Sequence, residues 1–113
     1  MGSQASKIAV SQAQFDALWL AGIFDRDKAG SFFESDVDVP GVTALRAAFD
    51  GTCIHLFSRE EAGQVHAALT ELANAEDAIA EDKHHFDSDE RKAARSACRS
   101  LTSLAGKVLR SKL

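Results

Sequence analysis

Hydrophobic residues recur every three or four positions in four stretches of the chain, which is the spacing of one face of an α-helix. The stretches cover residues 11–24, 40–49, 58–83 and 87–110. The residues expected to face inward are Phe15, Leu18, Trp19 and Ile23; Val42, Leu45, Ala48 and Phe49; Ala62, Val65, Leu69, Leu72 and Ile79; and Ala94, Ala97, Cys98, Leu101, Leu104 and Val108.

Polar residues at the starts of three stretches match helix caps. In a capping box, a Ser, Thr or Asp at the cap is followed three residues later by Glu or Gln. The matching pairs are Ser11 with Gln14, Ser58 with Glu61, and Asp87 with Glu90. Pro40 suits the first turn of the second helix, and Asp50-Gly51 ends it.

Two short segments have strand character. Thr52–Phe57 consists mostly of β-forming residues, and Lys7–Val10 is a short apolar run. Residues 84–88 form a short turn, so the last two helices should pack antiparallel. We therefore predict a mainly α single small domain at 7–113, with about four helices, a C-terminal antiparallel helical hairpin and a minor two-stranded β element. Residues 1–6 are expected to be a flexible tail.

Length and composition suit a cytoplasmic protein. At 113 residues with 45% hydrophobic residues, the chain is long enough for one core. No apolar run approaches the roughly 20 residues that span a bilayer, and no signal peptide opens the chain. Cys53 and Cys98 lie far apart without a framework pattern, which predicts reduced thiols.

Charge is segregated along the chain. Residues 1–90 hold all 17 acidic residues and six basic ones, giving −11, whereas residues 91–113 hold seven basic residues and no acid, giving +7. Within the basic part, Arg91, Arg95, Arg99 and Arg110 follow helical spacing on one face, together with Thr102 and Gly106. Such a basic stripe either pairs with the acidic helix beside it or binds an acidic partner.

The N-terminus resembles an N-myristoylation signal. Gly2 becomes terminal once Met1 is removed, and Ser6 and Lys7 follow at the positions that the signal prefers. One myristoyl chain binds membrane only marginally, so the basic C-terminal helix would have to supply a second attraction. Met-Gly-Ser is also a common cloning remnant, and both interpretations stay open.

Residues 25–36 resemble an EF-hand calcium loop. Asp25, Asp27 and Gly30 match loop positions one, three and six. Ala29 offers no side-chain oxygen at position five, and Asp36 replaces the bidentate Glu at position twelve. We interpret the segment as an acidic turn and expect no calcium binding at cytosolic concentrations.

Histidine and cysteine chemistry is sparse. Cys53 and His55 share one face of the expected strand, and His84-His85 lie in the turn with Asp87 and Asp89. None of these has the spacing of a zinc site, and no nucleotide-binding loop or catalytic motif is present. The sequence predicts no enzymatic activity and no cofactor.

By exclusion, the sequence favours a non-enzymatic regulator, adaptor or inhibitor that docks electrostatically on a partner protein. Its acidic body would also suit nucleic-acid mimicry. The alternative is a peripheral protein held on an anionic membrane surface, at the cytoplasmic face, by lipidated Gly2 and the basic helix. A nucleic-acid-binding regulator is the third hypothesis, which the net charge of −4 disfavours.

Overall fold

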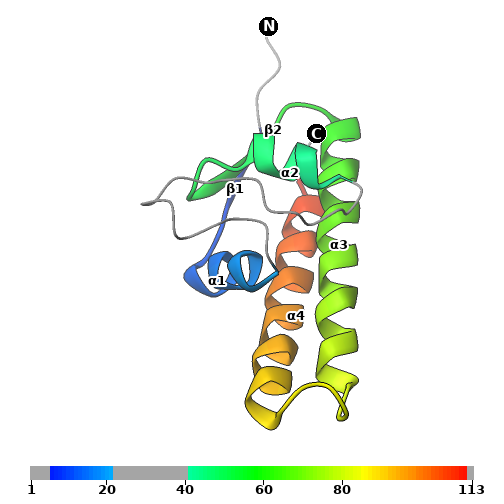
Figure 1. Cartoon of the computed structure of the whole chain (residues 1–113). Coiled ribbons are helices and arrows are strands. Elements are labelled where there is room, and N and C mark those ends of the chain that lie inside the picture. Colours follow the sequence, from blue (N-terminus) through cyan, green and yellow to red (C-terminus); the bar gives the residue numbers. More distant parts are fainter. Residues whose placement is uncertain (1–5, 22–40, 112–113) are drawn as a thin grey trace, which may run out of the picture.

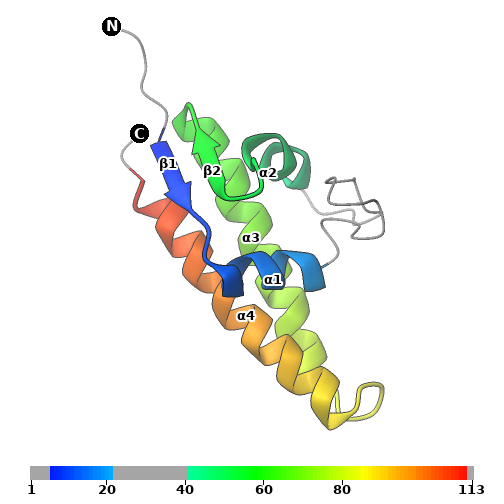
Figure 2. The ribbon, with the colours of Figure 1, turned by 90° about the vertical axis from the view of Figure 1, so that its left-hand side faces the viewer.

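A long helical hairpin supports a second layer of two short helices and a small sheet. The computed structural model describes residues 6–21 and 41–111. Its elements, in chain order, are β1 (Ser6–Ala9), α1 (Gln12–Leu20), α2 (Val42–Ala48), β2 (Cys53–Leu56), α3 (Arg59–Glu81) and α4 (Ser88–Leu109). In Figures 1 and 2, α1, α2 and the two strands all lie on one side of the α3–α4 hairpin.

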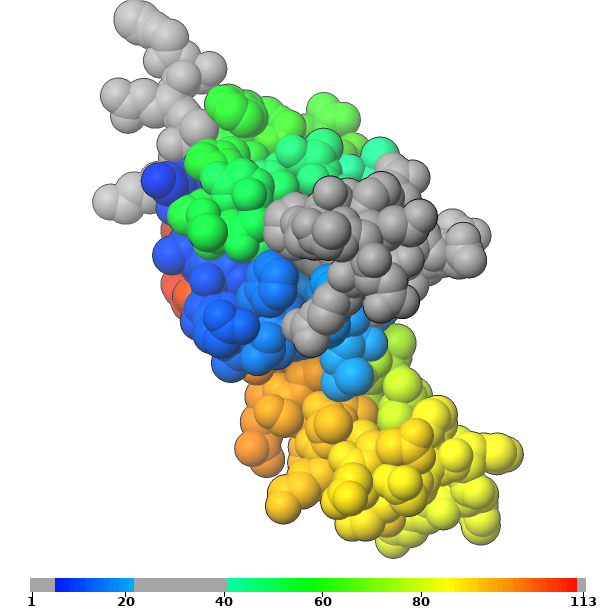
Figure 3. All heavy atoms as spheres, turned by 60° about the vertical axis from the view of Figure 1, so that its left-hand side comes forward, coloured from blue at the N-terminus to red at the C-terminus, as the bar shows by residue number. Residues whose placement is uncertain are grey.

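The hairpin forms because α3 and α4 each bury one stripe of aliphatic residues against the other. Leu69, Leu101 and Leu104 are fully buried between the layers. Small residues such as Ala73 and Ala97 let the two helices approach closely. The space-filling view shows the turn end of the hairpin projecting beyond α1 (Figure 3). The prediction of an antiparallel C-terminal hairpin is confirmed.

The two strands form an antiparallel sheet in which Ile8 pairs with Ile54. Ile8, Ile54 and Leu56 are buried toward the helices, while Lys7 and His55 lie on the other face. The minor β element is therefore confirmed. β1 begins at Ser6, which the sequence assigned to the tail; residues 1–5 lie outside the described residues.

Gly41 brings the start of α2 against α3. Its φ of 86° lies in the left-handed region, and a Cβ at this position would come within 2.3 Å of the Gln64 carbonyl oxygen. Only glycine fits this approach. α2 begins at Val42 rather than at Pro40, which lies outside the described residues. Its predicted inward residues Val42, Leu45, Ala48 and Phe49 are all buried.

Helix caps match the sequence with one difference. Ser11–Gln14 and Asp87–Glu90 form complete capping boxes. Ser58 accepts a hydrogen bond from the Glu61 N–H, but the Glu61 carboxylate accepts from Phe57 N at 2.9 Å instead of from the cap residue. The predicted capping box at Ser58 is therefore only half formed: the bond from the Glu61 N–H is present, but the Glu61 side chain does not accept from the Ser58 N–H.

Two helix ends differ from the sequence-based expectation. α1 ends at Leu20, about one turn before Phe24, with Ala21 as its C-cap. Gly22, a residue type common just after helix ends, follows directly in the sequence. α3 ends at Glu81 because the Asp82 carboxylate accepts hydrogen bonds from the backbone N–H groups of His84 and His85. Among the described residues, no helix is long and apolar enough to cross a membrane.

Candidate functional site

The outer face of α4 carries the cationic residues predicted from the sequence. Asp87 caps this helix, its buried stripe faces α3 and α1, and its period of about 3.6 residues leaves the arginines on the opposite side. Arg95, Arg99 and Arg110 are exposed, and Arg91 is half-buried. We call Arg91, Arg95, Arg99 and Arg110 the basic stripe. It extends over about 28 Å, because a helix rises about 1.5 Å per residue.

Each arginine of the stripe has a different environment. The Nε of Arg91 is buried and has no hydrogen-bond partner in the described part of the chain. Arg95 donates through Nη2 to the Ala80 carbonyl oxygen over a long 3.5 Å. The guanidinium of Arg110 lies against Gly106, where a Cβ would come within 3.0 Å of its Nη1. The stripe is therefore only weakly held by its own chain.

None of the basic side chains of α4 forms an ion pair with a described carboxylate. Among residues 6–21 and 41–111, the contacts within 4.0 Å between a basic side chain and a carboxylate are those of His55 with Asp50 and of His85 with Asp82. Asp77 and Glu81 of the neighbouring α3 are exposed and unpaired within this part of the structure. The complementary charges of the two helices are adjacent without being matched in pairs.

Lys107 belongs to the basic part of the sequence but not to this surface. Its ammonium donates to the Ala9 carbonyl oxygen and to Gln14 Oε1, each at 3.0 Å. Gln14 is buried and also donates through Nε2 to Ser103 Oγ at 3.3 Å. This network fastens the junction of β1 and α1 to the C-terminal half of α4. Sequence reasoning identified Gln14 only as a capping residue.

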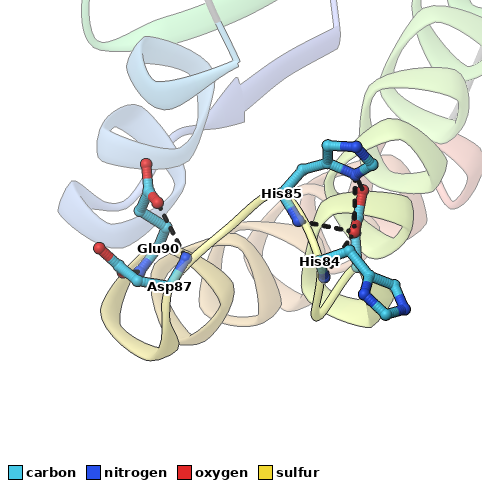
Figure 4. A network of polar contacts seen from close by, with 5 residues as sticks. His84, His85, Asp87 and Glu90 are labelled. Atoms are coloured by element: carbon cyan, nitrogen blue, oxygen red, sulfur yellow. Dashed lines mark hydrogen bonds and ion pairs between the residues drawn. The ribbon is translucent and has the colours of Figure 1, made fainter.

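In the hairpin turn, His85 contacts Asp82 through its side chain and His84 only through its backbone N–H. His85 Nδ1 contacts the Asp82 carboxylate at 2.9 Å, as Figure 4 shows beside the separate Asp87–Glu90 cap. Burial raises the pKa of Asp82, but hydrogen bonds from His85 and from two backbone N–H groups outweigh it, so the pKa lies below the usual 3.8. The contacts close the turn.

A second carboxylate–imidazole pair joins Asp50, which precedes β2, to His55 within β2, and the sequence did not predict it. Asp50 Oδ2 lies 2.6 Å from His55 Nε2, while Oδ1 accepts from the N–H groups of Thr52 and Cys53. The hydrogen bond with His55, followed by those from Cys53 and Thr52, holds the pKa of Asp50 far below its usual range. Cys53 lies on the same strand face as His55, as predicted, but no hydrogen bond joins these two side chains in the described structure.

Metal ligation has no support in the described residues. Among residues 6–21 and 41–111, no group of three or more His, Cys, Asp or Glu side chains is arranged to hold an ion. The EF-hand-like Asp25, Asp27 and Asp36 lie outside this part of the structure, as does Gly2. Cys98 is half-buried against the core, close to its expected place, and His66 is half-buried at its edge.

Comparison with known proteins gives no relative from which a function can be transferred. No protein-family model, no curated protein and no solved structure matches the chain.

Proposed function

We propose that the protein is a regulator that docks electrostatically on an acidic surface of a partner protein through the basic stripe of α4. One observation carries the proposal. The arginines of the stripe have no carboxylate partner in the described structure, although the acidic helix α3 runs beside them. Unmatched charge at a surface contributes little to stability and acts mainly on association with other molecules.

The charge arrangement of α3 and α4 favours a protein as the binding partner over a uniform polyanion such as a nucleic acid or an anionic membrane. Asp77 and Glu81 are exposed on α3 close to the level of Arg95. These carboxylates repel a continuous row of phosphates, whether in duplex DNA or in an anionic bilayer, but they can match a surface of mixed charge. Helix α4 contains no aromatic residue, so single-stranded bases have no aromatic platform along the stripe.

The spacing suggests what a complementary surface looks like. Arg91, Arg95 and Arg99 are four residues apart, so their Cα atoms follow one another at about 6 Å along the helix. A partner helix that carries carboxylates four residues apart has the same repeat. The proposed contact is therefore two helices side by side, with charge-assisted hydrogen bonds between them.

An NMR titration tests this proposal. An alanine-based helical peptide with glutamate at every fourth position is added to the labelled protein at low and at high salt. We expect shifts of backbone amides over residues 91–99, which weaken at high salt. Arg95→Glu/Arg99→Glu should abolish them, while the matched control Arg95→Lys/Arg99→Lys keeps the charge and should retain most of them.

The alternative partners are tested in parallel with duplex DNA and with phosphatidylserine vesicles. Tighter binding to either than to the peptide would favour the nucleic-acid or membrane hypothesis. Peptide shifts that stay unchanged in Arg95→Glu/Arg99→Glu, or that are absent for the wild type at low salt, would refute docking through the stripe.

A further inference from the structure

The side of the hairpin opposite α1, α2 and the sheet is uncovered in the described structure. All of these elements lie on the same side of α3 and α4 (Figure 2). Asp77 and Glu81 of α3 and Arg95 and Arg99 of α4 are exposed, and helical periodicity separates them from the buried stripes, which places them on the uncovered side. We call this surface the rear face. It is divided lengthwise into an acidic half on α3 and a basic half on α4.

The opposite charges occupy the same level along the hairpin. The contact between Arg95 Nη2 and the Ala80 carbonyl oxygen places Arg95 close to the level of Glu81. Because α3 and α4 are antiparallel, moving from Arg95 to Arg99 corresponds to moving from Glu81 to Asp77, about 6 Å in each helix. Two carboxylates therefore lie beside two guanidinium groups as parallel rows without ion pairs between them.

The far end of the rear face carries an apolar knob beside a shallow groove. Leu109 is 70% exposed, the most exposed large hydrophobic side chain in the described residues. The groove next to it is lined on α3 by Ala62, Gly63 and His66. A Cβ at Gly63 would meet nothing within 4 Å, so the space above this glycine is open.

We infer that the rear face binds the rear face of a second copy of this chain. A two-fold axis parallel to the hairpin brings α3 of one copy opposite α4 of the other at the same level. Arg95 and Arg99 then face Glu81 and Asp77 of the second copy, twice by symmetry. The same rotation sets Leu109 against the other copy's groove at Gly63. The inference rests on the proposed function, since it names the acidic partner of the stripe.

The size of the surface implies a reversible dimer. The hairpin is about 34 Å long and two helices wide, which gives roughly 600 Å² per copy. Stable interfaces bury about 800 Å² per partner, so this contact is at the low end of that class. Most of its attraction is electrostatic, and dissociation on addition of salt follows.

Sedimentation velocity on the full chain, with charge-reversed variants, tests the dimer. We expect the wild type to dimerise at low salt and to dissociate at high salt. Arg95→Glu/Arg99→Glu and Asp77→Lys/Glu81→Lys should each be monomeric, because like charges then face each other across the axis. An equimolar mixture of these two variants should form heterodimers, which native mass spectrometry identifies by their mass.

Two further variants control the interpretation. Glu60→Lys/Glu71→Lys should dimerise like the wild type, because these exposed carboxylates lie on another side of α3, where Glu60 lines a groove with α2 and Glu71 follows about three turns later. Leu109→Ser removes the knob and should weaken the dimer at least about tenfold, since it removes buried apolar surface twice. Thermal unfolding of each variant verifies that it is folded.

The outcomes separate this inference from the proposed function. A wild type that stays monomeric at all concentrations, or a variant mixture that stays monomeric, would refute the dimer. If the glutamate peptide still binds the wild type in either case and not Arg95→Glu/Arg99→Glu, the docking proposal stands without it. A dimer that forms equally in Arg95→Glu/Arg99→Glu would show that copies meet through another surface.

Discussion

Replacing Lys107 by methionine should destabilise the fold far more than its partly exposed position suggests. The ammonium makes two hydrogen bonds of 3.0 Å, to the Ala9 carbonyl oxygen and to Gln14 Oε1. These bonds tie the junction of β1 and α1 to α4, across more than 90 residues of sequence. Met keeps the aliphatic length of Lys but has no donor.

The magnitude follows from the two acceptors. Hydrogen bonds with a charged donor contribute about 1.5–3 kcal/mol where they are shielded from water. Gln14 Oε1 is buried but keeps its bond from Ser11 N at 2.9 Å, and the Ala9 carbonyl belongs to an exposed residue that water can reach. We therefore expect a loss of about 1.5–3 kcal/mol for both contacts together.

Urea unfolding followed by circular dichroism measures this loss as a shift of the midpoint at constant slope. Lys92→Met is the matched control, because Lys92 is exposed on the same helix and its side chain has no hydrogen bond in the described structure. This substitution should change the unfolding free energy by less than about 0.5 kcal/mol. A double-mutant cycle of Lys107→Met with Gln14→Leu should show coupling of at least about 0.5 kcal/mol. Equal effects of Lys107→Met and Lys92→Met would refute the role of this contact.

Three further predictions concern the core and two titrating groups. Leu101→Ala should lower the unfolding free energy by about 2–5 kcal/mol, because this side chain is fully buried; a loss below about 0.5 kcal/mol in urea unfolding would mean that the face assignment is wrong. Glu76 is 6% exposed, and burial raises its pKa above 4.5. Ionisation of this buried carboxyl group therefore lowers the free energy of unfolding as the pH rises from 4.5 through the folded pKa. Glu76→Leu should add about 1–3 kcal/mol at pH 7 and remove this slope, and a destabilised variant would contradict the account. Because the pKa of Asp50 is lowered in the folded state, its carboxylate stabilises the fold above pH 3.8, and this contribution is lost as the pH falls through the folded pKa. Asp50→Asn should therefore lower the melting temperature at pH 7 and flatten the pH dependence of the melting temperature below pH 3.8. Unchanged acid sensitivity would show that the pair with His55 is unimportant.

The sequence predicted the helices well because their determinants are local. Caps such as Ser11 and Asp87 need only residues three positions away, and the apolar stripes follow directly from helical periodicity. Helix ends were less accurate: α3 stops where Asp82 binds the following N–H groups, and such a turn competes with continued helix in a way that periodicity does not reveal.

Tertiary contacts account for what the sequence missed. Lys107 looked like another cation of the basic part, and only the packing of the β1–α1 junction on α4 shows that it is engaged. The pair of Asp50 with His55 depends on how the turn at Gly51 folds back on β2. Glu76 is one of several acidic residues in the third helical stretch of the sequence, and its burial follows only from the arrangement of the whole hairpin. The basic stripe itself was predictable, since it depends on spacing within one helix.

We propose that the charge of the basic stripe is available to a partner and does not hold the fold together. The most direct test is the unfolding free energy of Arg95→Gln/Arg99→Gln, which removes both charges without adding carboxylates beside Asp77 and Glu81, relative to the wild type at low salt and at protein concentrations where both are monomeric. The structure predicts a difference below about 0.5 kcal/mol, because neither arginine has a carboxylate partner in the described residues. A loss above about 1 kcal/mol that disappears at high salt would contradict the claim and show that α4 is paired with α3 within one chain.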